Sequence, residues 1–370
     1  MATTTGQDPI AVTLRLDRDE YTVLAGGGLL ARCGELVVGR SGLAPRRAAL
    51  VTDSNVAPLY ADAVAASLGS AGISTVPIVV PAGEASKSME QTTDICRAML
   101  RAGLDRKSCL VALGGGVVGD LAGFAAAIFQ RGIPCIQIPT TIVSQVDSSV
   151  GGKTGVNTPE GKNLVGAFHQ PRLVLADTDT LATLPEREFN EGFAEIIKHA
   201  AIRDASLLDL VEDPASVRRR LPELVARNVG IKAAVVEEDE RETTGARALL
   251  NFGHTLGHGI EAAGGYGRFL HGEAISLGLV AATRLSVEKA GLLSGDGERI
   301  LAALRAYGLP TRLADDISDE TILAAMGRDK KFEAGQIRFV LLRSLGDAYL
   351  SREIGEDDLR KALAALRTET

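Results

Sequence analysis

The sequence predicts an α/β amino-terminal domain with a mostly parallel, Rossmann-like sheet, followed by a mainly α-helical carboxyl-terminal domain. Up to about residue 182, short apolar runs alternate with helical patterns, which is typical of βαβ units. Beyond that point, helical patterns follow one another with a single strand-like run. A chain of 370 residues has room for about two domains, which we place at residues 1–182 and 183–370.

Each element is predicted from its apolar pattern and from the turn residues at its ends. In the first domain the strands are 21–25, 47–53, 74–81, 108–114, 135–140 and 173–177, and the helices are 59–68, 88–102 and 120–129. In the second domain the helices are 186–202, 215–238, 246–263, 272–290, 298–307, 319–326 and 356–366, with one strand at 337–342. We expect Pro222 to interrupt the second of these helices.

The composition excludes several classes of protein. A formal net charge of -7 argues against a nucleic-acid partner bound by a broad basic surface. No apolar run approaches the roughly 18 residues of a membrane span, and the amino-terminal residues lack a signal-peptide pattern, so we expect no membrane partner and a cytoplasmic location. The four cysteines lie far apart in apolar stretches, which favours buried thiols in a reducing compartment.

A glycine-rich turn indicates a nucleotide site. Residues 114–119 read GGGVVG between an apolar strand and a helix, and such glycines let the backbone approach a pyrophosphate. The acidic residue that follows about 20 residues later in the usual Rossmann pattern is missing. Asp53, at the end of an earlier strand with Asn55 beside it, could reach an adenosine ribose instead. The alternative is a glycine-rich turn that binds nothing.

Histidines and a glutamate indicate a metal site. His254 and His258 are four residues apart and share a helix face, His271 follows thirteen residues later, and Glu195 lies on an earlier helix. Two imidazoles and a carboxylate suit zinc and leave one position open for catalysis. Thr255 occupies the position of the glutamate base of a zinc protease, which argues against that class. The alternative is a set of surface or core histidines.

Cationic and polar side chains within this acidic chain indicate an anionic, hydroxylated small substrate. Lysine and arginine bind phosphate and carboxylate through charge-assisted hydrogen bonds. Any single lysine could instead be a solvated surface charge. The set comprises Arg131, Asp147, Lys153, Lys162, Asn163, Lys198, Lys232, Arg247, Asn251, Lys330 and Lys331.

Eight motifs occur in order along the chain: GGGVVGDLAGFAAAIFQRG, IPTTIVSQVDSSVGGKTGVN, GKNLVGAFHQP, EGFAEIIKH, EEDERE, LLNFGHTLGHGIEA, HGEA and RDKK. In these motifs and their order, the chain resembles the 3-dehydroquinate synthase family of the sugar phosphate cyclase superfamily over about residues 20–365. The segment Glu242–Arg247 departs from the pattern by one extra residue, which affects the expected placement of Lys232.

The resemblance implies a dehydroquinate synthase-like fold and a role for each matching residue. Zinc or cobalt is expected on Glu195, His254 and His271, with His258 on the substrate side. A homodimer is expected, with Arg131 reaching the neighbouring site. NAD is expected at Asp53, Asn55, Glu84, Lys87, Gly115, Gly116, Asp120, Thr140, Thr141, Lys162 and Thr183. Substrate is expected at Arg131, Asp147, Lys153, Asn163, Lys198, Lys232, Arg247, Asn251, His258 and either Lys330 or Lys331.

The implied reaction converts 3-deoxy-D-arabino-heptulosonate 7-phosphate to 3-dehydroquinate and phosphate, a carbon–oxygen lyase step of the shikimate pathway. It proceeds by transient oxidation with NAD, elimination of phosphate, re-reduction and an intramolecular aldol closure. Three alternatives remain: a sister cyclase with a different or aminated substrate, a metal-dependent polyol dehydrogenase, and a non-catalytic nucleotide-binding protein.

Overall fold

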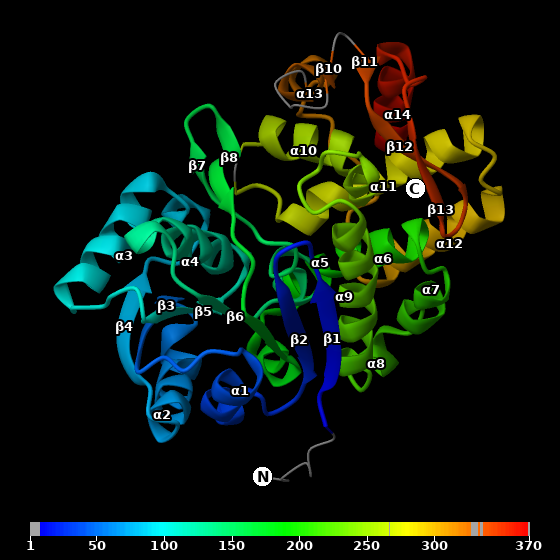
Figure 1. Cartoon of the computed structure of the whole chain (residues 1–370). Helices are drawn as coiled ribbons and strands as arrows, with labels where there is room; N and C mark the ends of the chain where they lie inside the picture. Colours follow the sequence, from blue (N-terminus) through cyan, green and yellow to red (C-terminus); the bar gives the residue numbers. More distant parts are fainter. Residues whose placement is uncertain (1–7, 266, 327–331, 334–335, 369–370) are drawn as a thin grey trace. The chain divides into compact units, whose positions relative to one another are not determined.

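The chain forms two compact units in the computed structural model, which describes residues 8–265, 267–326, 332–333 and 336–368 (Figure 1). One unit comprises Met1–Leu184 and Leu221–Glu237, and the other comprises Pro185–Arg220 and Glu238–Thr370. The boundary predicted after residue 182 lies close to the end of the first segment. A later helix, residues 221–237, also belongs to the first unit, so one boundary along the sequence does not separate the two units.

The first unit is built on a seven-stranded sheet in the order β1-β2-β9-β6-β5-β3-β4. All neighbouring strands are parallel except β1 and β2, so the predicted mostly parallel sheet is confirmed. Strand β1 was not predicted, although Val12 and Leu14 alternate with polar residues; it is the edge of the sheet, and within it only Leu14 is buried. The strands are β1 (Ile10–Arg15), β2 (Glu20–Gly26), β3 (Arg47–Asp53), β4 (Ser74–Val80), β5 (Cys109–Gly114), β6 (Cys135–Pro139) and β9 (Leu173–Asp177).

Helices cover both faces of this sheet (Figure 1). Alternate residues of one strand point into two separate cores: Leu50 packs with α1 (Cys33–Arg40) and α2 (Asp62–Ser70), and Val51 packs with α3 (Met89–Arg101) and α4 (Gly116–Ile128). Burial on both faces explains why these strands read as unbroken apolar runs. Helix α9 (Leu221–Glu238) joins this unit, and its Glu237 accepts a hydrogen bond from the Arg15 backbone N–H at 2.7 Å.

A β-hairpin of β7 (Lys153–Thr158) and β8 (Gly161–Phe168) escaped the sequence prediction. Its strands contain glycines and polar residues in place of an alternating apolar pattern. One of these glycines is needed for packing, because a Cβ at Gly166 would lie 2.1 Å from the Thr154 carbonyl oxygen. The hairpin carries three predicted substrate or nucleotide residues, Lys153, Lys162 and Asn163.

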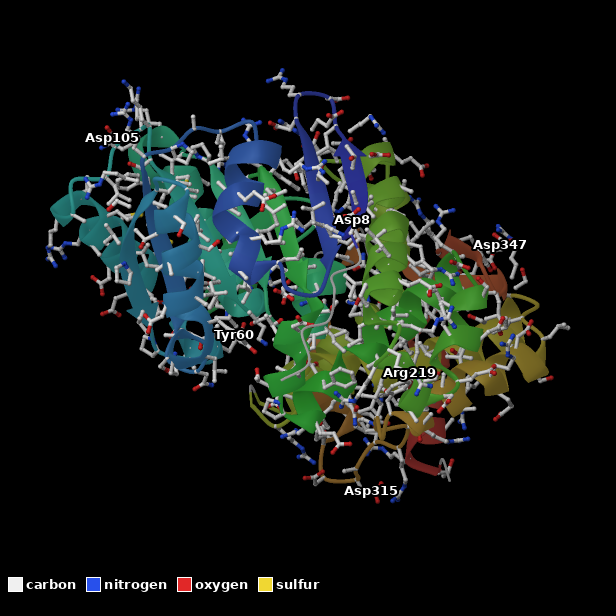
Figure 2. All side chains as sticks on the ribbon, turned by 90° about the horizontal axis from the view of Figure 1, so that it is seen from below. Asp8, Tyr60, Asp105, Arg219, Asp315 and Asp347 are labelled. Carbon is white, nitrogen blue, oxygen red and sulfur yellow. The ribbon has the colours of Figure 1, made fainter. Side chains whose placement is uncertain are left out.

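The parallel strands place their ends at opposite sides of the first unit. Tyr60 follows the carboxyl end of β3, Asp105 precedes the amino end of β5, and Figure 2 shows the two side chains at opposite ends of this unit. Open parallel sheets bind ligands at the carboxyl edge. The Tyr60 end of the unit is therefore the end at which a nucleotide is expected to bind.

The second unit is mainly helical, as predicted. Three predicted helices are interrupted: the first at Gly192, the second by residues 218–220 just before Pro222, and the third at Gly253, whose φ is 78°. The helices are α5 (Glu186–Glu191), α6 (Phe193–Ile202), α7 (Ser206–Val211), α8 (Pro214–Val217), α10 (His254–Ala263), α11 (His271–Lys289), α12 (Ser294–Ala306), α13 (Asp319–Met326) and α14 (Glu356–Thr368). The strand pairs are β10 (Phe332–Glu333) with β11 (Gln336–Ile337), and β12 (Phe339–Ser344) with β13 (Asp347–Ser351).

No helix within the described ranges combines the length and the apolar character that a membrane crossing requires.

The close approach of α1 and α2 yields a stability prediction. A Cβ at Gly34 would lie 2.2 Å from the Ser67 carbonyl oxygen, so Gly34→Ala must push the two helices apart. We expect it to lower the free energy of unfolding by about 1–3 kcal/mol, measured by urea denaturation. Gly39→Ala on the exposed side of α1 is the control, since nothing lies within 4 Å of its Cβ; it should be neutral or stabilising. Equal midpoints for the two variants would contradict the packing.

Candidate active site

The carboxyl edge of the sheet gathers the predicted nucleotide residues of the first unit. The register pairs Thr52 of β3 with Leu113 of β5 and pairs Gly114 with Pro139 of β6. Asp53, the glycine-rich turn and Thr140 therefore follow neighbouring strand ends. The Asp53 carboxylate already accepts the backbone N–H groups of Asn55 and Val56, at 2.8 and 3.0 Å, which fixes the turn after β3.

The glycine-rich turn leaves the amino end of α4 accessible to an anion. Glycine is favoured there by packing, because a Cβ at Gly114 would lie 2.7 Å from the Val118 Cβ. No side chain in the described part of the chain caps α4 at Gly115. Nearby, the buried hydroxyl of Thr140 has no hydrogen-bond partner among the described residues. An uncapped helix end beside an unsatisfied hydroxyl fits a dinucleotide phosphate.

A second cluster joins the hairpin to the segment after β4. Lys87 Nζ lies 2.6 Å from Asp120 Oδ2 on α4, and both side chains are largely buried. Burial raises the pKa of Asp120, and the Lys87 ammonium opposes that shift. Asn157 of β7 donates from Nδ2 to Glu84 Oε1 at 2.8 Å, and Lys162 Nζ lies 3.7 Å from the same oxygen. Asn157 was absent from the predicted site, because its position in a polar stretch of sequence gave no signal.

The remaining nucleotide residues form local contacts. The Thr183 hydroxyl lies 2.5 Å from the Tyr60 hydroxyl, and the Thr141 and Ser144 hydroxyls lie 2.9 Å apart. These contacts hold the loops that follow β3, β6 and β9 in place.

The first unit also brings together predicted substrate residues. Lys232 Nζ on α9 lies 2.7 Å from both the carboxylate and the backbone carbonyl of Asp147, although 85 residues separate them in the sequence. Lys153 is exposed at the start of β7. Arg131 has a φ of 70°, which is strained for a long side chain, and Asn163 has a φ of 57°, which asparagine tolerates better than most residues. Such strain is common at functional sites.

In the second unit, Glu195, His254 and His271 converge. Glu195 Oε1 lies 3.3 Å from His254 Nε2 and 3.6 Å from His271 Nε2, and its side chain is fully buried. Ligand atoms about 2.0–2.1 Å from a tetrahedral ion stand roughly 3.3 Å apart. The three donor atoms therefore fit one divalent ion. The His258 ring centre lies 5.2 and 5.9 Å from those of His254 and His271.

Charges around Glu195 favour its ionised form. Burial alone would raise the pKa of Glu195, but Lys198 and His254 outweigh burial and hold the pKa well below its usual range. Lys198, itself buried, forms an ion pair with Glu195 Oε2. Burial lowers the pKa of His254. For His271 burial is outweighed by the carboxylates of Glu195 and Glu261, which raise its pKa to about 10.

Glycines set the spacing of the helices that carry this cluster. A Cβ at Gly278 of α11 would lie 1.9 Å from the Gly253 carbonyl oxygen, directly before His254. A Cβ at Gly272 would lie 1.9 Å from the Glu191 carbonyl oxygen, and Glu191 Oε2 accepts the Gly272 N–H at 2.6 Å. Both histidines are thus fixed by backbone contacts that tolerate no side chain.

A single buried carboxylate holds the loop of Arg247. Asp239 accepts hydrogen bonds from the backbone N–H groups of Thr243, Thr244, Gly245 and Arg247, at 2.7 to 3.3 Å. Arg247 is 2% exposed and donates from Nη1 to the Glu240 carbonyl oxygen at 2.9 Å. Asn251 ends the short helix that begins at Ala246. Lys330 and Lys331 lie outside the described residues.

Comparison with known proteins decides the family. Residues 77–191 match the model of the 3-dehydroquinate synthase N-terminal domain, and residues 192–332 match that of the C-terminal domain. The chain belongs to the 3-dehydroquinate synthase family. The 3-dehydroquinate synthase of Symbiobacterium thermophilum is 48% identical over 96% of this chain and 100% of its own length. That of Caulobacter vibrioides is 47% identical over 95% and 97%.

Solved structures agree on the fold. The 2-epi-5-epi-valiolone synthase of Streptomyces hygroscopicus, with NAD+ and Zn2+ bound, matches with a TM-score of 0.85, 30% identity and coverage of 95% of this chain and 98% of its own. A 2-deoxy-scyllo-inosose synthase with carbaglucose-6-phosphate, NAD+ and Co2+ matches with a TM-score of 0.86 over 96% and 99%; at 24% identity it shows the fold alone.

The Asp239 carboxylate gives a pH-dependent prediction for this family member. Burial alone would raise the pKa of Asp239, but the hydrogen bonds from four backbone N–H groups outweigh burial and lower the pKa to about 2. The unfolded value is about 3.9, so the stabilisation is complete above pH 4 and is lost between about pH 4 and 2. Asp239→Asn should therefore lower the free energy of unfolding at pH 7 by about 1–3 kcal/mol and lower it progressively less towards pH 3, in urea titrations. The exposed Glu298→Gln is the control, and a difference that is constant with pH would contradict this role.

Proposed function

We propose that the chain converts 3-deoxy-D-arabino-heptulosonate 7-phosphate to 3-dehydroquinate and phosphate, as a carbon–oxygen lyase that uses NAD and one zinc or cobalt ion. The main support for this proposal is sequence identity. The chain is 48% identical over nearly its whole length to the 3-dehydroquinate synthase of Symbiobacterium thermophilum, and 30% identical to the sister cyclase 2-epi-5-epi-valiolone synthase. The clustering of Glu195, His254 and His271 supports it, because a non-catalytic descendant has no need to keep three converging donors.

The two cofactors supply distinct chemistry. When bound, NAD accepts and later returns a hydride, and the metal ion polarises the hydroxyl group that is oxidised. Glu195, His254 and His271 are the proposed metal ligands, and Lys198 keeps the Glu195 carboxylate ionised. The carboxyl edge of the sheet is the proposed NAD site. Its members are Asp53, Asn55, Glu84, Lys87, Gly115, Gly116, Asp120, Thr140, Thr141, Lys162 and Thr183.

The proposed substrate residues bind charge and fix orientation. Asp147 accepts a hydrogen bond from a substrate hydroxyl while Lys232 fixes the Asp147 carboxylate. Arg247 and Lys162 meet the substrate carboxylate, and Asn251 also contacts the substrate. Lys153, Asn163, Lys198, His258, Arg131 and one of Lys330 and Lys331 complete the set. Cations hold the phosphate as a dianion next to the C6 hydrogen, so a phosphate oxygen accepts that proton during elimination. The ring-opened product then closes by an intramolecular aldol step.

Two enzymatic alternatives differ in measurable ways. A sister cyclase would release phosphate from another sugar phosphate. A polyol dehydrogenase would release NADH. The two matching glycerol dehydrogenase structures are 16% identical to this chain, which supports only a shared architecture.

A homodimer with Arg131 at the neighbouring site and a cytoplasmic location complete the proposal. The strained backbone at Gln130 and Arg131 supports a role for Arg131 beyond its own loop. All four cysteines are free thiols, in agreement with a reducing compartment.

The reaction predicts phosphate release without net reduction of NAD. Purified protein with NAD, Co2+ and the heptulosonate phosphate should release one phosphate per 3-dehydroquinate, while absorbance at 340 nm stays constant after the first turnover. NADH accumulating in proportion to turnover would support the dehydrogenase instead. Phosphate release from other sugar phosphates alone would support a sister cyclase.

The assigned roles of neighbouring histidines predict opposite effects on metal content. His271→Ala removes a proposed ligand and should lower both bound metal and turnover by at least tenfold. His258→Ala, in the same cluster, should keep about one equivalent of metal and lose turnover. Elemental analysis and the phosphate assay measure the two effects. A metal-replete and active His271→Ala variant would refute the ligand set.

A further inference from the structure

The two histidines proposed as metal ligands present the same ring nitrogen to Glu195. His254 and His271 both direct Nε2 towards Glu195 Oε1, at 3.3 and 3.6 Å. A neutral imidazole has one N–H and one lone pair. The lone pair is on Nε2 only when Nδ1 carries the hydrogen, so whatever accepts a hydrogen bond from Nδ1–H selects the metal-binding form.

For His254 this acceptor is backbone. Its Nδ1 lies 3.1 Å from the Phe252 carbonyl oxygen, two residues earlier in the chain. Phe252 is fully buried and Gly253 adopts a left-handed conformation, so the chain itself fixes this carbonyl.

For His271 the group at Nδ1 is a side chain. Glu261 Oε2 lies 3.6 Å from His271 Nδ1, and only 10% of the Glu261 side chain is exposed. Glu261 lies on α10, seven residues after His254 and three after His258, on the same helix face. Helix α10 therefore supplies the proposed ligand His254 and also the carboxylate of Glu261, which faces Nδ1 of His271 at the start of α11.

The position of Glu261 argues against direct ligation of the same ion. Nδ1 and Nε2 of an imidazole point away from one another, so a carboxylate at Nδ1 lies on the far side of the ring from an ion at Nε2. Glu261 could instead share a second ion with His258 and His271, whose donor atoms also lie within 4.8 Å of one another. Histidine ligands commonly donate their other ring N–H to a carboxylate, which orients the ring and increases its basicity.

We propose that Glu261 is a positioning residue: its carboxylate, now 3.6 Å from His271 Nδ1, accepts a hydrogen bond from Nδ1–H when metal is bound and thereby directs Nε2 to the metal. The inference rests on the metal site of the proposed function. The Glu261 carboxylate also offsets part of the positive charge that a divalent ion and Lys198 bring into this buried region.

The test measures affinity for Co2+ and Zn2+ by competition with a chromophoric chelator, on the full chain without substrate. Glu261→Ala should weaken affinity by about 10–100-fold, as removal of such partners does elsewhere. Glu261→Gln keeps an oxygen acceptor without the charge and should fall between wild type and Glu261→Ala. The visible spectrum of bound Co2+ should change in Glu261→Ala, which a loss of general stability alone does not produce. Glu288→Gln, exposed on α11, is the control and should match wild type.

Wild-type affinity and an unchanged Co2+ spectrum in Glu261→Ala would overturn the inference. So would a second equivalent of metal in wild type that is lost in Glu261→Ala, because Glu261 would then be a ligand. Failure of the wild-type chain to bind metal or release phosphate would overturn the proposed function itself, and the inference with it. The Glu261→Gln variant keeps the result interpretable if Glu261→Ala does not fold.

Discussion

The buried carboxylate of Glu195 is the interaction on which the second unit depends. A fully buried carboxylate is costly unless positive groups and hydrogen-bond donors surround it. Lys198 from the same helix and the two histidines of α10 and α11 supply them, so three helices are committed to one point. A divalent cation bound to Glu195 and the histidines would balance the negative charge of the carboxylate, as a protonated histidine does without metal. The proposed metal-binding geometry and the burial of this carboxylate therefore have a common origin.

Glycine contacts make that convergence possible. Gly253, Gly257 and Gly278 bring α10 and α11 to backbone contact, and Gly272 does the same for α11 and the end of α5. Any side chain at Gly278 or Gly272 would separate the helices and so move donor atoms that a metal requires within tenths of an ångström. Glycine lowers the stability of a helix, and at Gly257, Gly272 and Gly278 the close approach of neighbouring backbones explains its presence.

The sequence predicted what depends on local pattern. Strands β3 and β9 and helix α13 have the predicted limits because their apolar periodicity and turn residues are unambiguous. It missed the β7–β8 hairpin, whose strands contain glycines and polar residues, and the short edge strand β1, in which only Leu14 is buried. The motifs led to Glu195, His254 and His271, yet Asp239, Glu261 and Asn157 were missed. Each of these acts through a contact with another residue, and no spacing rule reports a contact made by folding.

The Asp147–Lys232 pair shows what the fold adds to the list of cations. As isolated residues, any of the lysines could be a solvated surface charge, and the extra residue near Arg247 made the placement of Lys232 uncertain from sequence. In the first unit Lys232 is 7% exposed and lies 2.7 Å from two oxygens of Asp147. A buried lysine that holds both the carboxylate and the backbone of one residue leaves that carboxylate a fixed direction. In the proposed function, this fixed direction would let Asp147 select one hydroxyl of an anionic sugar.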